Sequence, residues 1–344
     1  MTSTPETTSP RMEAPARAKV LQWIRSNRPT VIGVGLLVAL VVMGSLVVPG
    51  FISVQNARSI LLLAAFLGLA SLGQTMVALL GGLDLSIPYV IGAANILLPS
   101  LINAGMPAGL AMAILVLAGL VVGALNGALS YKLQGQALIM SLGFGFAVVG
   151  AAQIYTTLGS AVGGNVFAPI PAWLTNIAAF NGRFFGLPIP PVIVIWIAVT
   201  AVTLLIVKNT WFGHSLYALG GSRVAASRLL ISEFRTWLAV HAISGGMSAF
   251  TGVLLLGFSG GGYVAVGDPY LFTTVAAVVI GGTSLLGGGG GYGSTVIGAL
   301  VLTVLTSLLV GMGMSFAAQQ AVVGLLIIPM VALYARTPHI RSQI

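Results

Sequence analysis

Residues 108–130 read AGLAMAILVLAGLVVGALNGALS, an apolar run without a single charged side chain. An α-helix rises about 1.5 Å per residue, so a run of this length crosses the hydrocarbon core of a bilayer, which is about 30 Å thick. Lys132 follows the run, where a basic side chain can reach the headgroups. The stretch predicts a transmembrane helix, and it identifies lipid as the solvent in which this part of the chain folds.

The composition extends that conclusion to the whole chain. Hydrophobic residues make up 57% of the 344 residues and charged residues 6%, and the mean hydropathy is +1.06. Soluble domains carry about 25% charged residues, so this chain cannot build a soluble surface of ordinary size. The 46 glycines suit close helix packing inside a bilayer. The lack of cysteine excludes disulfides and cysteine nucleophiles.

The same criterion of apolar length finds further spans along the chain. The sequence predicts an all-α, polytopic membrane protein with about ten transmembrane helices. The predicted spans are Val31–Val48, Ser59–Leu80, Ile87–Ala104, Ala108–Ser130, Ala137–Leu158, Pro191–Val207, Trp237–Phe258, Pro269–Leu285, Gly293–Met314 and Phe316–Tyr334.

Basic residues orient these spans. If the N-terminus is cytoplasmic, only Arg58 and Arg183 of the 14 Lys and Arg residues fall on the outer side. Cytoplasmic loops carry the excess of Lys and Arg in membrane proteins, so both termini are predicted to be cytoplasmic. The residues then on the cytoplasmic side are Arg11, Arg17, Lys19, Arg25, Arg28, Lys132, Lys208, Arg223, Arg228, Arg235, Arg336 and Arg341.

The chain divides into a transmembrane domain and two tails. Residues 1–28 are rich in Thr, Ser and Pro and predict a disordered cytoplasmic tail. Residues 29–336 form the transmembrane domain, and 337–344 form a short cytoplasmic tail. The first apolar run is longer than the 7–15 residues usual in a signal peptide, so it is interpreted as an uncleaved anchor.

Several kinds of chemistry are missing. Asp84 and Asp268, the acids near the spans, both lie at span ends, whereas ion-coupled carriers place charged groups inside the bundle. The run Gly287–Thr295 resembles a phosphate loop but has Gly293 where the Walker lysine belongs. No metal-binding spacing of histidines, nucleophile elbow or paired carboxylates is present. The sequence predicts no catalytic site, no metal site and no cofactor, and its basic residues do not gather with aromatics as for nucleic acid.

Uncharged polar residues inside the spans suggest a path for solute. Gln74, Asn95, Asn126 and Gln153 lie within the second to fifth spans, with Asp84 between two of them. Each amide alone is explained by a hydrogen bond between helices, worth about 0.6 kcal/mol. Together they suit a neutral, hydroxyl-rich solute, because amides both donate and accept. For Asp84, capping of the next helix and a gating role are equally open.

The longest cytoplasmic loop, residues 208–236, predicts a docking segment. Gly220-Gly221 ends any preceding helix, Ser222 is a candidate N-cap, and Arg223–Ile231 has the composition of a short helix. A short basic helix here either binds a motor subunit or lies on anionic headgroups. The residues predicted to form the coupling segment are Gly220, Gly221, Ser222, Arg223, Ala225, Ala226 and Arg228.

Three motifs in order resemble one family. The stretch ALGGSRVAASRLLI, residues 218–231, resembles the ALGGNxxAARLSGI loop of the ribose-type permeases of ABC sugar importers. GGLDLS, residues 81–86, is similar to that family's GGIDLS element. AAVVIGGTSLLGG, residues 276–288, is similar to its AAVVIGGTSLFGG run. The resemblance covers roughly residues 40–335.

The resemblance implies a permease subunit in the bacterial cytoplasmic (inner) membrane. It implies a cytoplasmic ABC ATPase that docks on the loop at 220–231, a second permease subunit (identical or different), and an extracytoplasmic sugar-binding protein. The expected cargo is a neutral monosaccharide or related polyol. Ser222, Arg223 and Leu229-Leu230 depart from the family pattern, which usually shows Ser-Gly at the last pair. The alternative is a self-contained facilitator or secondary carrier that works without an ATPase.

Overall fold

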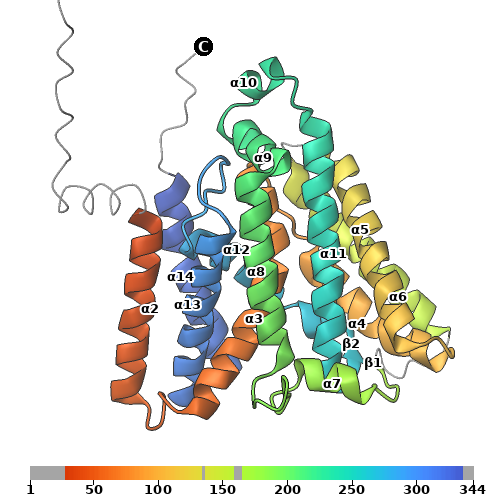
Figure 1. Cartoon of the computed structure of the whole chain (residues 1–344), viewed down its shortest axis with the longest axis vertical. Coiled ribbons are helices and arrows are strands. Elements are labelled where there is room, and N and C mark those ends of the chain that lie inside the picture. Colours follow the sequence, from red (N-terminus) through yellow and green to blue (C-terminus); the bar gives the residue numbers. More distant parts are fainter. Residues whose placement is uncertain (1–27, 134–135, 159–164, 336–344) are drawn as a thin grey trace, which may run out of the picture.

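A computed structural model describes residues 28–133, 136–158 and 165–335. The predicted tails, 1–28 and 337–344, lie outside these residues apart from Arg28. The described chain is mostly helical (Figure 1). Its helices are α2 (Arg28–Val47), α3 (Val54–Leu79), α4 (Ile87–Asn103), α5 (Ala108–Tyr131), α6 (Ala137–Thr157), α7 (Ala172–Ala178), α8 (Pro191–Asn209), α9 (Trp211–Gly221), α10 (Arg223–Arg228), α11 (Glu233–Ser259), α12 (Tyr270–Ile280), α13 (Tyr292–Gly311) and α14 (Phe316–Ala335).

Each predicted span contains one helix. Seven helices of the described part are long and apolar enough to cross a membrane: α2, α3, α5, α6, α8, α11 and α13. The helices within the third, eighth and tenth spans have shorter apolar segments. The chain is therefore an all-α, multi-pass membrane protein, while ten as the number of crossings stays a prediction. The eighth span was predicted to reach Leu285, but α12 ends at Ile280, because Gly282 adopts a left-handed conformation with φ of 89° and turns the chain.

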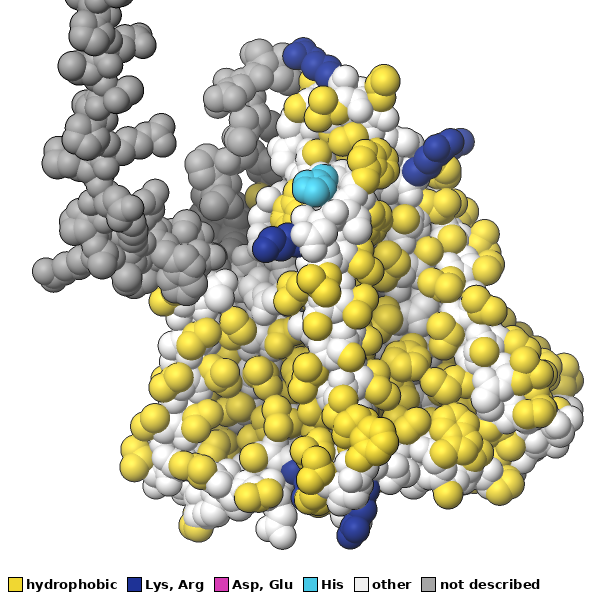
Figure 2. Space-filling model, in the orientation of Figure 1, with side chains coloured by type: hydrophobic (Ala, Val, Ile, Leu, Met, Phe, Trp, Pro, Cys, Tyr) yellow, Lys and Arg dark blue, Asp and Glu magenta, His cyan; other side chains and the backbone are white. Residues whose placement is uncertain are grey.

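The basic residues lie toward two opposite ends of the molecule. Tyr131, next to Lys132, packs on Phe234, with ring centroids 5.1 Å apart, so the ends of α5 and α11 meet near α10. Arg58 lies over the ring of Phe180, 5.2 Å from its centroid, at the opposite end near α7. On the face shown in Figure 2, hydrophobic side chains cover the middle, and Lys and Arg side chains lie toward the upper and lower ends.

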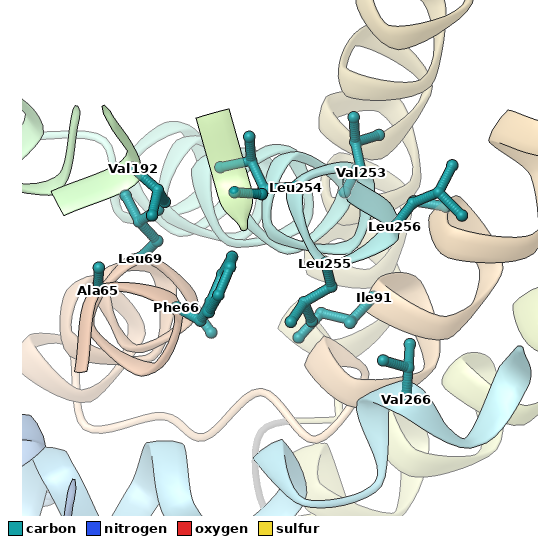
Figure 3. Packing of buried hydrophobic residues seen from close by; sticks show 14 of the residues in the cluster. Ala65, Phe66, Leu69, Ile91, Val192, Val253, Leu254, Leu255, Leu256 and Val266 are labelled. Atoms are coloured by element: carbon teal, nitrogen blue, oxygen red, sulfur yellow. The ribbon is translucent and has the colours of Figure 1, made fainter. Parts of the chain in front are cut away.

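The core is built around α3 and α11, which are buried along most of their lengths. Phe66 and Leu69 of α3 face Leu254 of α11 across one interface (Figure 3). Val192 of α8 packs from one side and Ile91 of α4 from another. Of the polar side chains described below, Gln74 projects from α3 and Ser244 from α11.

Small residues bring α5 and α11 close together. Gly119, Gly123 and Gly127 repeat every four residues along α5, so they share one face of that helix. A Cβ added at Gly123 would overlap the carbonyl oxygen of His241 on α11. Without a hydrophobic force between helices in lipid, such backbone contact is what holds two helices together.

The connections also carry ordered structure that the sequence did not predict. Strand β1 (Asn165–Val166) pairs antiparallel with β2 (Gly262–Tyr263), with Val166 opposite Gly262. Helix α7 lies at the same end of the molecule (Figure 1). A short 3-10 helix, Val264–Gly267, then leads into α12.

Candidate functional site

The turn after α3 carries Asp84 into the bundle. Helix α3 ends where Gly81 adopts a left-handed conformation, with φ of 78°, and the Gly82 amide donates back to the carbonyl of Val77 at 3.1 Å. A Cβ on Gly82 would lie 2.8 Å from the Trp237 ring, so only glycine lets the chain pass there. The side chain of Asp84 is 1% exposed.

Five hydrogen bonds surround the Asp84 carboxylate. Its Oδ1 accepts from the amide and hydroxyl of Ser86 (2.9 and 2.6 Å), from the Ser141 hydroxyl (2.9 Å) and from Nδ2 of Asn126 (3.1 Å). Its Oδ2 accepts from the Ser244 hydroxyl at 2.6 Å. We call Asp84, Ser86, Asn126, Ser141 and Ser244 the carboxylate cluster. Among the described residues no Lys or Arg pairs with Asp84, so neutral donors alone stabilise it. A buried charge needs such donors.

The cluster lies well inside the bundle. Ser244 is eleven residues into α11, which corresponds to roughly 16 Å along the helix axis. Asn126 belongs to α5 and Ser141 to α6, so one carboxylate joins the start of α4 to three other helices. The sequence placed Asp84 at the end of a span, which holds along the chain. In space the residue is buried, because side chains of α5, α6 and α11 surround its carboxylate.

The structure supports the capping interpretation of Asp84 in part. The N-cap position of α4 is Ser86, whose own side chain makes no capping bond. Asp84 accepts the Ser86 amide, two residues on, as Asx-turns do. The carboxylate therefore orders the entry to α4, and it accepts four further hydrogen bonds that a cap does not require.

The predicted polar path is divided by the structure. Gln74 lies beside the cluster, since its Oε1 accepts the Asp84 amide at 3.3 Å. Asn95 lies elsewhere and joins α4 to other segments: it donates to the carbonyl of Gly252 at 2.9 Å and accepts from the amide of Tyr263 at 2.9 Å. Gln153 is exposed on α6. The structure brings together Gln74, Asp84 and Asn126, and not Asn95 or Gln153.

Two buried amide atoms in this region have no hydrogen-bond partner among the described residues. They are Nε2 of Gln74 and Oδ1 of Asn126, and both residues are fully buried. One is a donor and the other an acceptor, which is the pair of functions that a hydroxyl group can satisfy.

A second polar region lies at the end of the molecule near α9. The loop from Gly287 to Gly291 joins α12 to α13, and the Gly288 amide donates to the carbonyl of Leu79 at 3.0 Å. Tyr217 of α9 donates from its hydroxyl to the carbonyl of Gly290 at 2.7 Å. Burial raises the pKa of the Tyr217 phenol, so the hydroxyl remains a donor at physiological pH.

Gly220 completes this contact. A Cβ added there would overlap the carbonyl oxygen of Leu79 and lie 2.6 Å from the amide nitrogen of Gly288. We call Leu79, Gly220 and Gly288 the glycine junction. It joins α9 to the end of α3 and to the loop before α13, a few residues from Asp84. The junction therefore places α9 in direct contact with the end of α3, which leads into the turn that carries Asp84.

The predicted coupling segment forms α9 and α10. Ser222 is the N-cap of α10, and its side chain accepts from the amide of Ala225 at 3.2 Å. The short helix ends at Arg228, before the predicted end at Ile231. Arg223 pairs with Glu233 of α11 at 3.1 Å.

The two faces of α10 differ. Ala226 is 1% exposed and packs in a cluster with Leu216, Leu219 and Trp237. Gly221, Ser222, Arg223, Ala225 and Arg228 are exposed. Of the predicted coupling residues, Ala226 thus packs inward against its own chain, and these others remain accessible to a partner.

Sequence reasoning missed Ser141, Ser244 and Tyr217. The two serines interrupt the apolar runs of α6 and α11, and that signal could have identified them, but only the fold shows that both meet Asp84. Tyr217 lies within the predicted loop of residues 208–236, where no role was predicted for it. Its partner is a backbone carbonyl, which no side-chain pattern predicts.

Comparisons with known proteins agree on one family. The family model described as branched-chain amino acid transport system / permease component matches residues 56–331. The chain is 31% identical over 280 residues to the ribose import permease protein RbsC of Haemophilus influenzae, covering 79% of this chain and 83% of the relative. It is 30% identical over 299 residues to the probable ABC transporter permease protein YphD of Escherichia coli, covering 86% and 87%.

A third relative matches a shorter part. The autoinducer 2 import system permease protein LsrD of Salmonella typhi is 29% identical over 209 residues, which cover 61% of this chain and 62% of the relative. No solved structure matches the chain.

Proposed function

Because the chain belongs to the family of permease components of branched-chain amino acid transport systems, we propose that it is the membrane-spanning subunit of an ATP-binding-cassette importer for a neutral monosaccharide or related polyol. The observation that carries the proposal is its likeness, over most of both chains, to a protein named as a ribose import permease. ATP hydrolysis takes place on a separate subunit in this proposal.

The bundle supports a neutral cargo. Among the described residues no Lys or Arg is buried, so the carboxylate of an amino acid would find no side-chain cation inside. The unpaired amide atoms of Gln74 and Asn126 suit hydroxyl groups instead. We assign Gln74, Asp84 and Asn126 to the translocation path. In this proposal the carboxylate cluster closes the path by holding α4 against α5, α6 and α11. Asn95 then positions α4, and Gln153 faces lipid or a second permease subunit.

The end with α9 and α10 is the cytoplasmic end in this proposal. It carries Lys208, Arg223, Arg228 and Arg235, as cytoplasmic loops do. Both ends of the described chain lie at this end (Figure 1). A cytoplasmic ATPase docks there on the exposed face of α10, while a solute-binding protein docks at the end with α7. Ten crossings and the bacterial inner membrane complete the proposal.

Uptake by proteoliposomes tests the function. The chain is reconstituted with the ATPase of its importer inside the vesicles and the binding protein outside, and labelled ribose is supplied. Accumulation should require ATP and all three proteins. Accumulation without the ATPase would indicate the self-contained carrier instead, and uptake of a branched-chain amino acid in place of ribose would overturn the cargo class.

A further inference from the structure

The turn that ends α10 places leucine where this chain otherwise uses glycine. The amide of Leu230 donates to the carbonyl of Ser227 at 3.0 Å, and that of Ile231 to Ala226 at 3.2 Å, which is the Schellman pattern. That pattern needs a left-handed residue at its centre, and Leu230 has φ of 57°. Four other helices end in the same turn, and each has glycine at this position: Gly81, Gly105, Gly282 and Gly313.

Leucine is unfavourable at this position for two reasons. Its Cβ crowds the backbone in the left-handed conformation, whereas glycine has no such penalty. Leu230 is also 92% exposed, so the described residues bury almost none of its side chain in compensation. Residues held in strained conformations persist where function requires them.

Leu230 does not stand alone. Leu229 is 70% exposed and Val224 is 67% exposed, so three large apolar side chains lie together on a helix of six residues and its turn. We call these three residues the apolar tip. Ala226, on the other face, anchors α10 to the body of the protein. The tip lies beyond the ends of the membrane-length helices (Figure 1).

We propose that Leu229 and Leu230 insert into an apolar pocket of the cytoplasmic ATPase and determine which ATPase this permease accepts. The inference rests on the proposed function, which places an ATPase at this end. The strained turn presents Leu230 outward, and contact with the pocket removes the exposed apolar surface from water. Arg228 beside the tip adds charge at the rim of the contact.

The test measures binding of the purified ATPase to the full-length permease in nanodiscs. Leu230→Asn keeps a residue that tolerates the left-handed conformation and removes the apolar side chain. We expect its Kd for the ATPase to rise about tenfold or more, as for the loss of one buried leucine contact. Leu230→Gly should weaken binding similarly, while the free permease melts at the same or a higher temperature because strain is relieved.

Phe185 supplies the matched control. It is 91% exposed with φ of 47°, and it lies in the tight turn between Phe184 and Leu187, near α7 at the opposite end. Phe185→Gly should leave the Kd for the ATPase unchanged.

The outcomes separate this inference from the proposed function. If Leu230→Asn binds the ATPase as tightly as wild type, the inference is wrong while the function stands. If the loss of affinity for the ATPase appears only in nanodiscs that contain anionic lipid, the tip is a membrane contact and the inference is again wrong. If the wild-type permease binds no ATPase, both proposals fail.

Discussion

Gly220 and Gly221 form a matched pair for testing the glycine junction. A Cβ at Gly220 would overlap backbone atoms of Leu79, whereas a Cβ at Gly221 meets nothing within 4 Å. We expect Gly220→Ala to displace α9, to cost about 1–3 kcal/mol of local packing and to reduce sugar uptake at least tenfold. Gly221→Ala should leave the packing of α9 and the melting temperature of the protein near wild type.

The readout that assigns a coupling role is the ratio of transport to ATP hydrolysis. In the reconstituted importer, Gly220→Ala should retain ATPase activity with less sugar moved per ATP. A parallel fall in both rates, with poor insertion of the protein, would show a folding defect instead.

Ser244 tests the stabilisation of the buried carboxylate. Ser244→Ala removes the donor to Oδ2 of Asp84 and should lower the free energy of unfolding by about 1–3 kcal/mol, the cost of a buried group left without its bond. Ser248 is the control, because it is also buried on α11 but donates to the carbonyl of Ser244 in its own helix. Thermal melting in detergent compares the two variants. Equal losses would mean that the carboxylate does not depend on this bond.

Leu230 departs from the family pattern, and the backbone conformation explains why that departure matters. By resemblance the position usually holds glycine, but the sequence does not show why. The structure supplies the reason, since φ is positive there. Backbone conformation of this kind follows from the hydrogen bonds of the turn, which residue types alone do not specify.

At the scale of elements, variants of Ala226 and Ala225 distinguish the packing of α10 against its own chain from the docking of the ATPase on α10. Ala226 is buried among apolar side chains, while its neighbour Ala225 is exposed. Ala226→Glu buries a charge without a partner and should detach α10 at a cost of roughly 3 kcal/mol or more. Ala225→Glu should leave α10 in place and weaken only the binding of the ATPase.

Hydrogen exchange of the α10 amides, measured without the ATPase, distinguishes the two variants. We expect protection of α10 to fall in Ala226→Glu and to persist in Ala225→Glu. Unchanged protection in Ala226→Glu would contradict the inward position of that residue.

The helices themselves were predictable because length and apolar composition in lipid leave few alternatives to a helix. Predicted and observed ends agree within a few residues for α4, α5 and α6. The Ser222 cap was confirmed as well. The burial of Asp84 could not be predicted, because it depends on side chains from α5, α6 and α11, which are distant in the sequence. The pairing of β1 with β2 is equally non-local, and each strand has only two residues.

At the scale of the whole molecule, the distribution of basic residues predicts which end faces the cytoplasm. A reporter fused at residue 170, near α7, should be detected outside, and one fused at residue 225, in α10, should be detected in the cytoplasm. The reverse result at both sites would invert the molecule in the membrane and place α10 out of reach of any ATPase.

The Asp84 carboxylate has a consequence for what the bundle can admit. Among the described residues no Lys or Arg pairs with Asp84, so in its ionised form this carboxylate carries an uncompensated negative charge in a region of low dielectric. Another anion at 8 Å would be repelled by about 2 kcal/mol at an effective dielectric of 20, more than a tenfold effect on occupancy. Phosphorylated sugars should therefore fail to compete with sugar for uptake by the wild-type protein. Asp84→Asn should allow them to compete. Equal competition in wild type and Asp84→Asn would contradict this role of the Asp84 charge. In a cell, a sugar that is phosphorylated after entry could not leave by the route through which it came.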